Sequence, residues 1–139
     1  MTLITLQHVF NTAWQAFIIE DKPPGMDPET KKCSYSGCAF GLCFPEGHPA
    51  KKETRTIEEV ISKYPELFDE SIIKLSETYE RAYYLFNFQY KLHDDLCYWN
   101  PITNKPAWKH SKEEMKQIYR YIAEQYKLTI PGEDTNVTA

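Results

Sequence analysis

Hydrophobic side chains in residues 3–20 recur every three or four positions, which is the period of one face of an α-helix. The apolar face of this segment consists of Leu3, Leu6, Phe10, Ala13, Trp14 and Phe17. The opposite side, which we expect to face water, carries His8, Asn11 and Gln15. Pro23 and Pro24 then stop the helix, because proline has no amide hydrogen for the hydrogen-bond ladder.

Residues 33–45 follow a different pattern, which is short, aromatic and interrupted by Gly37 and Gly41. This composition favours a tight turn between two short extended pieces over a helix. We therefore expect residues 33–48 to form a small Cys-rich knuckle or β-hairpin, inserted after the first helix.

Capping residues mark the start of two further helices. Thr56 with Glu59 three positions later is a capping box, and Pro65 ends the helix that it opens. Asp69 is a favourable N-cap for a long helix over about 70–99. Two apolar stripes run along this long helix, which predicts that it is packed on both sides and is the central element of the fold. The stripes are Tyr79, Tyr83, Phe86, Tyr90, His93 and Cys97 on one side, and Leu85, Phe88, Leu92, Leu96 and Trp99 on the other.

The last helix is predicted from Ser111 and Glu114, which form another capping box, to about Tyr126. Its expected buried stripe comprises Met115, Ile118, Tyr119, Ile122 and Tyr126. The predicted fold class is therefore mainly α, with three or four helices around the long central helix. We expect a single helical domain over residues 1–130 and a disordered tail over 131–139.

Composition narrows the function classes. The 139 residues include 14% aromatic side chains, which in so short a chain indicates an aromatic core or an aromatic contact surface. A net charge of -4 argues against nucleic acid as the main partner, because phosphate backbones are bound by concentrated positive charge. No stretch approaches the roughly 20 apolar residues of a membrane span, and the first residues do not resemble a signal peptide. We therefore expect a cytoplasmic protein with reduced thiols.

Three cysteines and a histidine are spaced five residues apart, and they are candidate metal ligands: Cys33, Cys38, Cys43 and His48. Zinc prefers four thiolate or imidazole ligands, and loops with closely spaced cysteines can supply them. The alternative is that the cysteines are buried thiols, since free cysteine packs as a small hydrophobic residue.

His93 and Cys97 form a second candidate set, because they lie one helical turn apart on one face of the predicted central helix. Together with Cys33 and Cys38 they would hold one zinc ion and pin the knuckle to that helix. The alternative is a core histidine beside a packed cysteine. His93 with Asp94 also matches the dyad of metal-dependent phosphohydrolases, and Cys38 or Cys43 is a candidate thiol nucleophile.

The segment Cys33-Ser-Tyr35 followed by Cys38-Ala-Phe-Gly41, with Pro45-Glu46 downstream and His93-Asp94 later, resembles a group of small proteins without an assigned activity that bacteriophages and prophages encode. The resemblance implies a phage-type origin. It also implies structural importance for Cys33, Tyr35, Cys38, Gly41 and His93.

These observations favour a small non-enzymatic protein that binds a host macromolecule and inhibits a defence or regulatory enzyme. Tyrosine and tryptophan, which are abundant here, are common at interface hot spots. Two alternatives stay open: an interaction module held by structural zinc, and a small metal- or thiol-dependent hydrolase.

Overall fold

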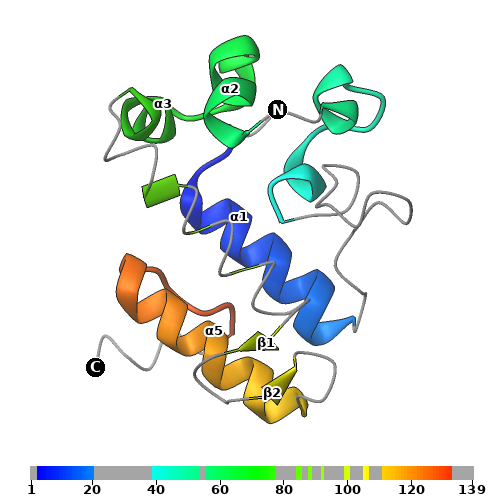
Figure 1. The fold of residues 1–139 in the computed structure, drawn as a ribbon, viewed down its shortest axis with the longest axis vertical. Coiled ribbons are helices and arrows are strands. Elements are labelled where there is room, and N and C mark those ends of the chain that lie inside the picture. The colour runs from blue at the N-terminus through cyan, green and yellow to red at the C-terminus, as the bar shows by residue number, and fades with distance from the viewer. Residues whose placement is uncertain are drawn as a thin grey trace.

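The computed structural model describes residues 3–20, 39–53, 56–77, 84, 85, 88, 92, 99–100, 105–106 and 111–132. The chain is mainly helical, as its sequence predicts. The first helix runs through the middle of the molecule, with α2 and α3 near one end of it and α5 along its side (Figure 1). Within the described ranges, we find no helix with the length and apolar character needed to cross a bilayer.

The first helix has two parts. The α-helix α1 (Leu6–Ala13) begins after Thr5, whose side-chain oxygen accepts a hydrogen bond from the His8 amide at 3.0 Å. It continues as a π-helix, η1 (Trp14–Ile19), which ends where the Glu20 amide donates to the Gln15 carbonyl at 2.9 Å. The helix predicted over 3–20 is confirmed from Leu6 to Ile19, but it begins three residues later than predicted, Leu3 is exposed, and its second half has the wider π geometry.

The structure describes four short helices between residues 39 and 68. They are the 3₁₀-helices η2 (Gly41–Cys43) and η3 (Pro49–Lys52), the α-helix α2 (Ile57–Lys63) and the 3₁₀-helix η4 (Pro65–Leu67). Thr56 is the N-cap of α2, as predicted, but its hydroxyl donates to the Glu59 carboxylate at 3.1 Å instead of accepting from the backbone. The Ile4 amide donates to the Leu67 carbonyl and the Ile4 carbonyl accepts from the Asp69 amide, both at 2.9 Å. These bonds fix the start of α1 against the end of η4.

The long helix predicted over 70–99 is wrong in its extent. Asp69 caps α3 (Glu70–Ser76) as expected, by accepting from the Ser71 amide, but this helix ends after two turns. The Ser76 hydroxyl donates to the Ile73 carbonyl at 2.7 Å, and the Glu77 amide bonds the Lys74 carbonyl, three residues back instead of four. Such side-chain competition and tightening are typical of a helix terminus.

At the C-terminal end of the predicted helix, the structure has a β-strand instead. The strand β1 (Trp99–Asn100) pairs antiparallel with β2 (Lys105–Pro106), so the helix does not reach Trp99. Helical backbone is present between these limits at Tyr84, Leu85, Phe88 and Leu92. The last three of these belong to the second predicted stripe, and all three are buried.

The helix α5 (Lys112–Tyr126) matches its prediction closely. Both bonds of the capping box between Ser111 and Glu114 are present. Ile118, Tyr119 and Ile122 are buried, and Met115 and Tyr126 pack partly buried against the core. The helix ends at Lys127, which adopts the left-handed conformation with φ 56° and ψ 45°.

Aromatic rings fill the space between these helices. The Tyr119 ring lies 5.5 Å from Phe10 and 6.1 Å from Trp14, which joins α5 to the first helix. Phe44 meets Phe68 edge to face at 6.0 Å, and Phe40 meets Phe88 in the same way at 6.3 Å. These aromatic residues thus contribute to one shared core.

Candidate functional site

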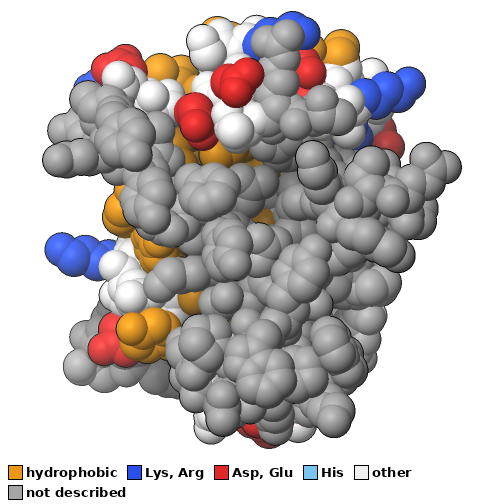
Figure 2. All heavy atoms as spheres, viewed as in Figure 1, with side chains coloured by type: hydrophobic (Ala, Val, Ile, Leu, Met, Phe, Trp, Pro, Cys, Tyr) orange, Lys and Arg blue, Asp and Glu red, His pale blue; other side chains and the backbone are white. Residues whose placement is uncertain are grey.

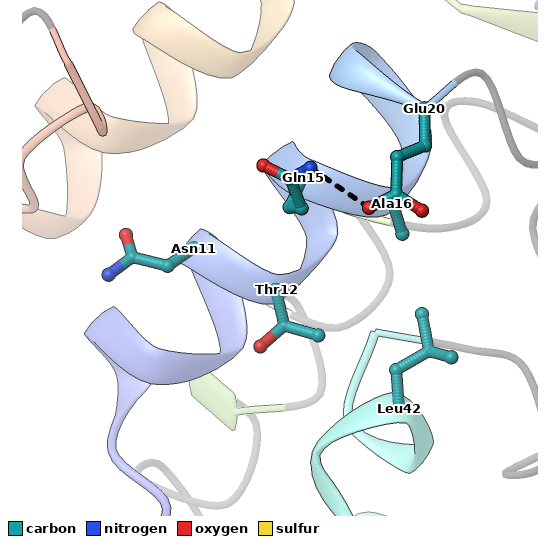
Figure 3. Close-up of a pocket in the computed structure, with 6 residues that line it drawn as sticks. All are labelled: Asn11, Thr12, Gln15, Ala16, Glu20 and Leu42. Carbon is teal, nitrogen blue, oxygen red and sulfur yellow. Dashed lines mark hydrogen bonds between the residues drawn. The ribbon is translucent and has the colours of Figure 1, made fainter.

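A cavity of about 380 Å³ lies between the first helix and η2. It is lined by Asn11, Thr12, Gln15, Ala16, Glu20 and Leu42. Figure 3 shows Leu42 extending from η2 toward the helix, with the other side chains supplied by α1, η1 and the residue that ends η1. The volume is within the range of small-ligand sites.

The π-helix explains why Glu20 lies at this cavity. Five residues of an α-helix correspond to about 500° of rotation, so Gln15 and Glu20 would point about 140° apart. A π-helix instead bonds residue i to residue i+5, which places these two residues about one turn apart. The Gln15 Nε2 consequently donates to Glu20 Oε2 at 2.9 Å (Figure 3).

Cys43, which follows the cavity residue Leu42 in η2, contacts the first helix. Its Sγ lies 3.4 Å from Thr12 Oγ1, 3.5 Å from the Ala39 carbonyl and 4.0 Å from the His8 carbonyl. Carbonyl oxygens only accept hydrogen bonds, so these contacts suit a protonated thiol that donates. Asn11 and Gln15, which we expected to face water, are exposed, whereas Thr12 beside them is half-buried against η2.

His48 caps η3 and contacts the region after α2. Its Nδ1 accepts from the Ala50 amide at 3.0 Å, and its ring meets Tyr64 edge to face at 5.1 Å. Its Nε2 lies 3.9 Å from Glu66 Oε1. Because Nδ1 accepts a hydrogen bond, the neutral ring carries its proton on Nε2 in this geometry. His48 thus has a structural role that its spacing from the cysteines did not indicate.

The structure describes only some of the residues that the sequence predicted as metal ligands. Cys43 and His48 hold the protein contacts described above, and no group of three or more potential ligands comes together among the described residues. The other four candidate ligands, Cys33, Cys38, His93 and Cys97, lie outside these residues, and so does Asp94. The zinc sets and the catalytic dyad therefore stay predictions.

Charged side chains also join the end of α2 to the segment that precedes this helix. Glu53 Oε2 accepts from the Tyr64 hydroxyl at 3.0 Å and from Lys63 Nζ at 2.9 Å. The hydrogen bond from Lys63 to Glu53, followed by their charge attraction, raises the pKa of this lysine. The lysine Nζ also lies 5.4 Å from the centre of the Tyr64 ring. All three side chains hold elements together.

Several tyrosines lie on or beside the C-terminal half of α5, and some of them are exposed while another is partly buried. We call Tyr84, Tyr121 and Tyr126 the α5 tyrosine group. Tyr121 is 47% exposed and Tyr84 is 38% exposed. Tyr84 meets Tyr126 at 4.8 Å between ring centres, and Tyr126 also meets Phe88 at 4.9 Å. Burial, followed by the charge of Tyr84, raises the pKa of Tyr126 to about 12, so this phenol is neutral at neutral pH.

Sequence reasoning missed the cavity residues Thr12, Glu20 and Leu42. Glu20 follows the apolar pattern of the first helix, and only the change to π geometry gives it a place beside Gln15. A comparison of the chain with models of protein families, with curated proteins and with solved structures finds no match.

Proposed function

We propose that this chain is a small non-catalytic protein of phage type that binds a host protein in the cytoplasm and inhibits a defence or regulatory enzyme. The α5 tyrosine group carries the proposal. Tyrosine gives a large contact area at a low cost in side-chain entropy, and it is enriched among residues that dominate binding energy. Tyr121 and Tyr84 have the exposure that this role needs, and the Tyr84 ring also packs against Tyr126, whereas Tyr121 lies on a different side of α5 from Tyr126.

The contacts that reactive side chains make within the described residues also support a binding role over a catalytic one. Cys43 joins η2 to α1, His48 caps η3, and Glu53 joins Lys63 and Tyr64. Catalytic groups are recognised by a nucleophile, a base and an orienting group that converge on a cavity. In these three cases the contacts instead connect neighbouring elements of the fold.

The distribution of charge fits a protein partner better than a nucleic acid. Figure 2 shows acidic side chains gathered over the end of the molecule that carries α2 and α3, with basic side chains at its margin. The ion pairs Lys63–Glu53 at 2.9 Å and Lys74–Glu70 at 3.4 Å illustrate this mixture. Phosphate backbones are attracted by uninterrupted positive charge, which mixed surfaces do not supply.

Affinity capture followed by inhibition tests the proposal. The full chain, Tyr121→Ala and the control Leu3→Ala are immobilised and exposed to a bacterial extract. Leu3 is a suitable control because it is 43% exposed, close to the 47% of Tyr121. We expect the wild type and the control to retain one host enzyme and to inhibit it. Tyr121→Ala should bind this enzyme about 30-fold more weakly, because the substitution removes a hot spot. Equal affinity of all three chains for the purified partner would contradict the role of the tyrosine.

We further propose that residues 33–48 act as a compact knuckle against the first helix. The 3₁₀-turn Gly41–Cys43 and the contact of Cys43 with Thr12 support this part of the arrangement. Structural zinc in the knuckle is the alternative reading of its cysteines. Elemental analysis of the purified chain, with a count of free thiols, distinguishes the two. One zinc per chain with protected thiols in the folded protein supports the metal, and no metal together with four reactive thiols on unfolding excludes it.

A further inference from the structure

A segment after α5 is held against the first helix by the side chain of Gln7. The Gln7 Nε2 donates to the Thr129 carbonyl at 2.9 Å, and its Oε1 accepts from the Thr129 amide at 2.9 Å and from the Thr129 hydroxyl at 3.2 Å. The same Nε2 donates to Asn11 Oδ1 at 2.7 Å, which orients the amide group. One side-chain amide therefore pairs with both backbone groups of Thr129, as the backbone of a neighbouring β-strand would.

The residues beside Thr129 give this segment the pattern of an extended chain that lies on an apolar surface. Leu128 and Ile130 pack partly buried against the core, whereas Thr129 between them is exposed. We call residues 128–130 the strap, and Gln7 the seat of the strap. Every copy of the chain carries both, so the strap of a second copy has the same groups that the seat binds here.

Lys127 is the hinge between α5 and the strap, and its backbone conformation is strained. Its φ of 56° and ψ of 45° are left-handed, and it is the non-glycine residue with a positive φ in the described part of the chain. This conformation brings the Cβ of an L-residue too close to the carbonyl oxygen that follows, so glycine is the usual residue at this place after a helix. A short hinge under strain favours the exchange of the segment that follows it between two copies.

We propose that two copies of this chain exchange their straps, so that Thr129 of each copy pairs with Gln7 of the other. The exchange retains the hydrogen bonds between strap and seat and relieves the strain at two hinges, against the cost of associating two chains. The Leu128 amide now donates to the Ala123 carbonyl at 2.8 Å. With Lys127 right-handed, α5 continues and this amide donates to the Glu124 carbonyl instead, so the bond is replaced.

Substitutions at the hinge test the proposal, because they change the strain in opposite directions. Lys127→Val raises the cost of the left-handed conformation, since β-branched residues are outliers there, and Lys127→Gly removes it. Both variants lose the same charge, so the repulsion between copies does not differ. Sedimentation of the full chains up to about 1 mM measures the dimer, and its dissociation constant should be at least about tenfold lower for Lys127→Val than for Lys127→Gly.

A mixture of two further variants shows whether the association uses strap and seat. Gln7→Ala has an intact strap without a seat, and Thr129→Pro has an intact seat but lacks the amide that the strap donates. In a mixed dimer the intact strap meets the intact seat, which neither chain achieves alone. The mixed dimer should therefore be at least about tenfold more stable than either homodimer, and circular dichroism checks that both chains are folded.

The control mixture replaces Gln7→Ala with Gln117→Ala, a substitution at an exposed glutamine of α5. Its strap is already seated in its own chain, so no gain from mixing with Thr129→Pro is expected. The proposal is overturned if all chains stay monomeric up to about 1 mM, if the two hinge variants associate equally, or if mixing Gln7→Ala with Thr129→Pro stabilises no dimer. Tyr121→Ala should associate like the wild type, so a failure of the exchange is distinct from a failure of the α5 tyrosine group.

Discussion

Tyr119 joins α5 to the rest of the core through two separable interactions. Its side chain is fully buried, with the ring 5.5 Å from Phe10 and 6.1 Å from Trp14. Its hydroxyl donates to the Leu92 carbonyl at 3.2 Å. Replacing Tyr119 by Phe removes the hydroxyl and retains the ring, whereas replacing it by Ala removes both.

The structure sets the expected magnitudes of the two changes. A buried hydrogen bond between neutral groups contributes a net of about 1 kcal/mol, so Tyr119→Phe should lower the free energy of unfolding by about that amount. Loss of a buried aromatic ring leaves a cavity and costs about 3–5 kcal/mol, so Tyr119→Ala should be several times more destabilising. The second value is a large part of the total stability of a small domain.

Urea unfolding followed by circular dichroism and tryptophan fluorescence measures both effects. For an m-value of about 2 kcal/mol per molar urea, Tyr119→Phe should move the midpoint down by about 0.5 M. The fluorescence of Trp14 should change more in Tyr119→Ala than in Tyr119→Phe, because the ring neighbours the indole. Equal destabilisation by the two substitutions would refute the reasoning, since it would assign the whole effect to the hydroxyl.

Three further predictions concern helix ends. Lys127→Gly should raise the free energy of unfolding by about 0.5–1 kcal/mol in thermal denaturation, because Lys127 has φ 56°, a conformation that glycine adopts without strain; a lower melting temperature would contradict this. Ser111→Ala should cost about 1 kcal/mol in urea unfolding, because it removes the acceptor for the Glu114 amide, and an unchanged midpoint would show that this cap contributes nothing. The hydrogen bonds from the Ser71 hydroxyl and amide hold the pKa of Asp69 below its usual value, so its contribution is present above the pKa of the unfolded carboxyl and lost as the pH falls through the folded pKa. As the pH falls below about 4, the free energy of unfolding of Asp69→Asn should therefore decrease less than that of the wild type. Unfolding measured at a series of pH values checks this, and an identical pH dependence of the two chains would contradict the assignment.

The positions where α3 and α5 begin could be predicted from the sequence, because a helix cap depends on only a few neighbouring residues. Asp69 and Ser111 occupy the N-cap positions expected of them, and the Ser111–Glu114 box forms in full. The buried face of α5 also followed from its period, since Ile118, Tyr119 and Ile122 are all buried. Each of these features is decided within one or two turns of helix.

The candidate site was less accessible to sequence reasoning. The polar side of the first helix is exposed at Asn11 and Gln15, as predicted, but the sequence did not indicate that Thr12 contacts Cys43 or that Gln15 bonds Glu20. Amphipathic periodicity assumes 3.6 residues per turn, and it gives no sign of the change to π geometry at Trp14. His48 was selected for its spacing from the cysteines, but its contacts with Ala50 and Tyr64 arise from the backbone turn and from α2.

The sequence by itself determined the helical class, the aromatic core and the caps of α3 and α5, because local hydrogen bonds and hydrophobic period suffice for these. The tertiary structure decided where α3 ends, that Trp99–Asn100 pairs as a strand, and that η2 packs against α1 at Thr12. These features depend on groups far apart in the chain, such as Thr12 with Cys43. A local pattern contains no information on which distant surface will meet it, and the free energy of that contact overrides the local preference.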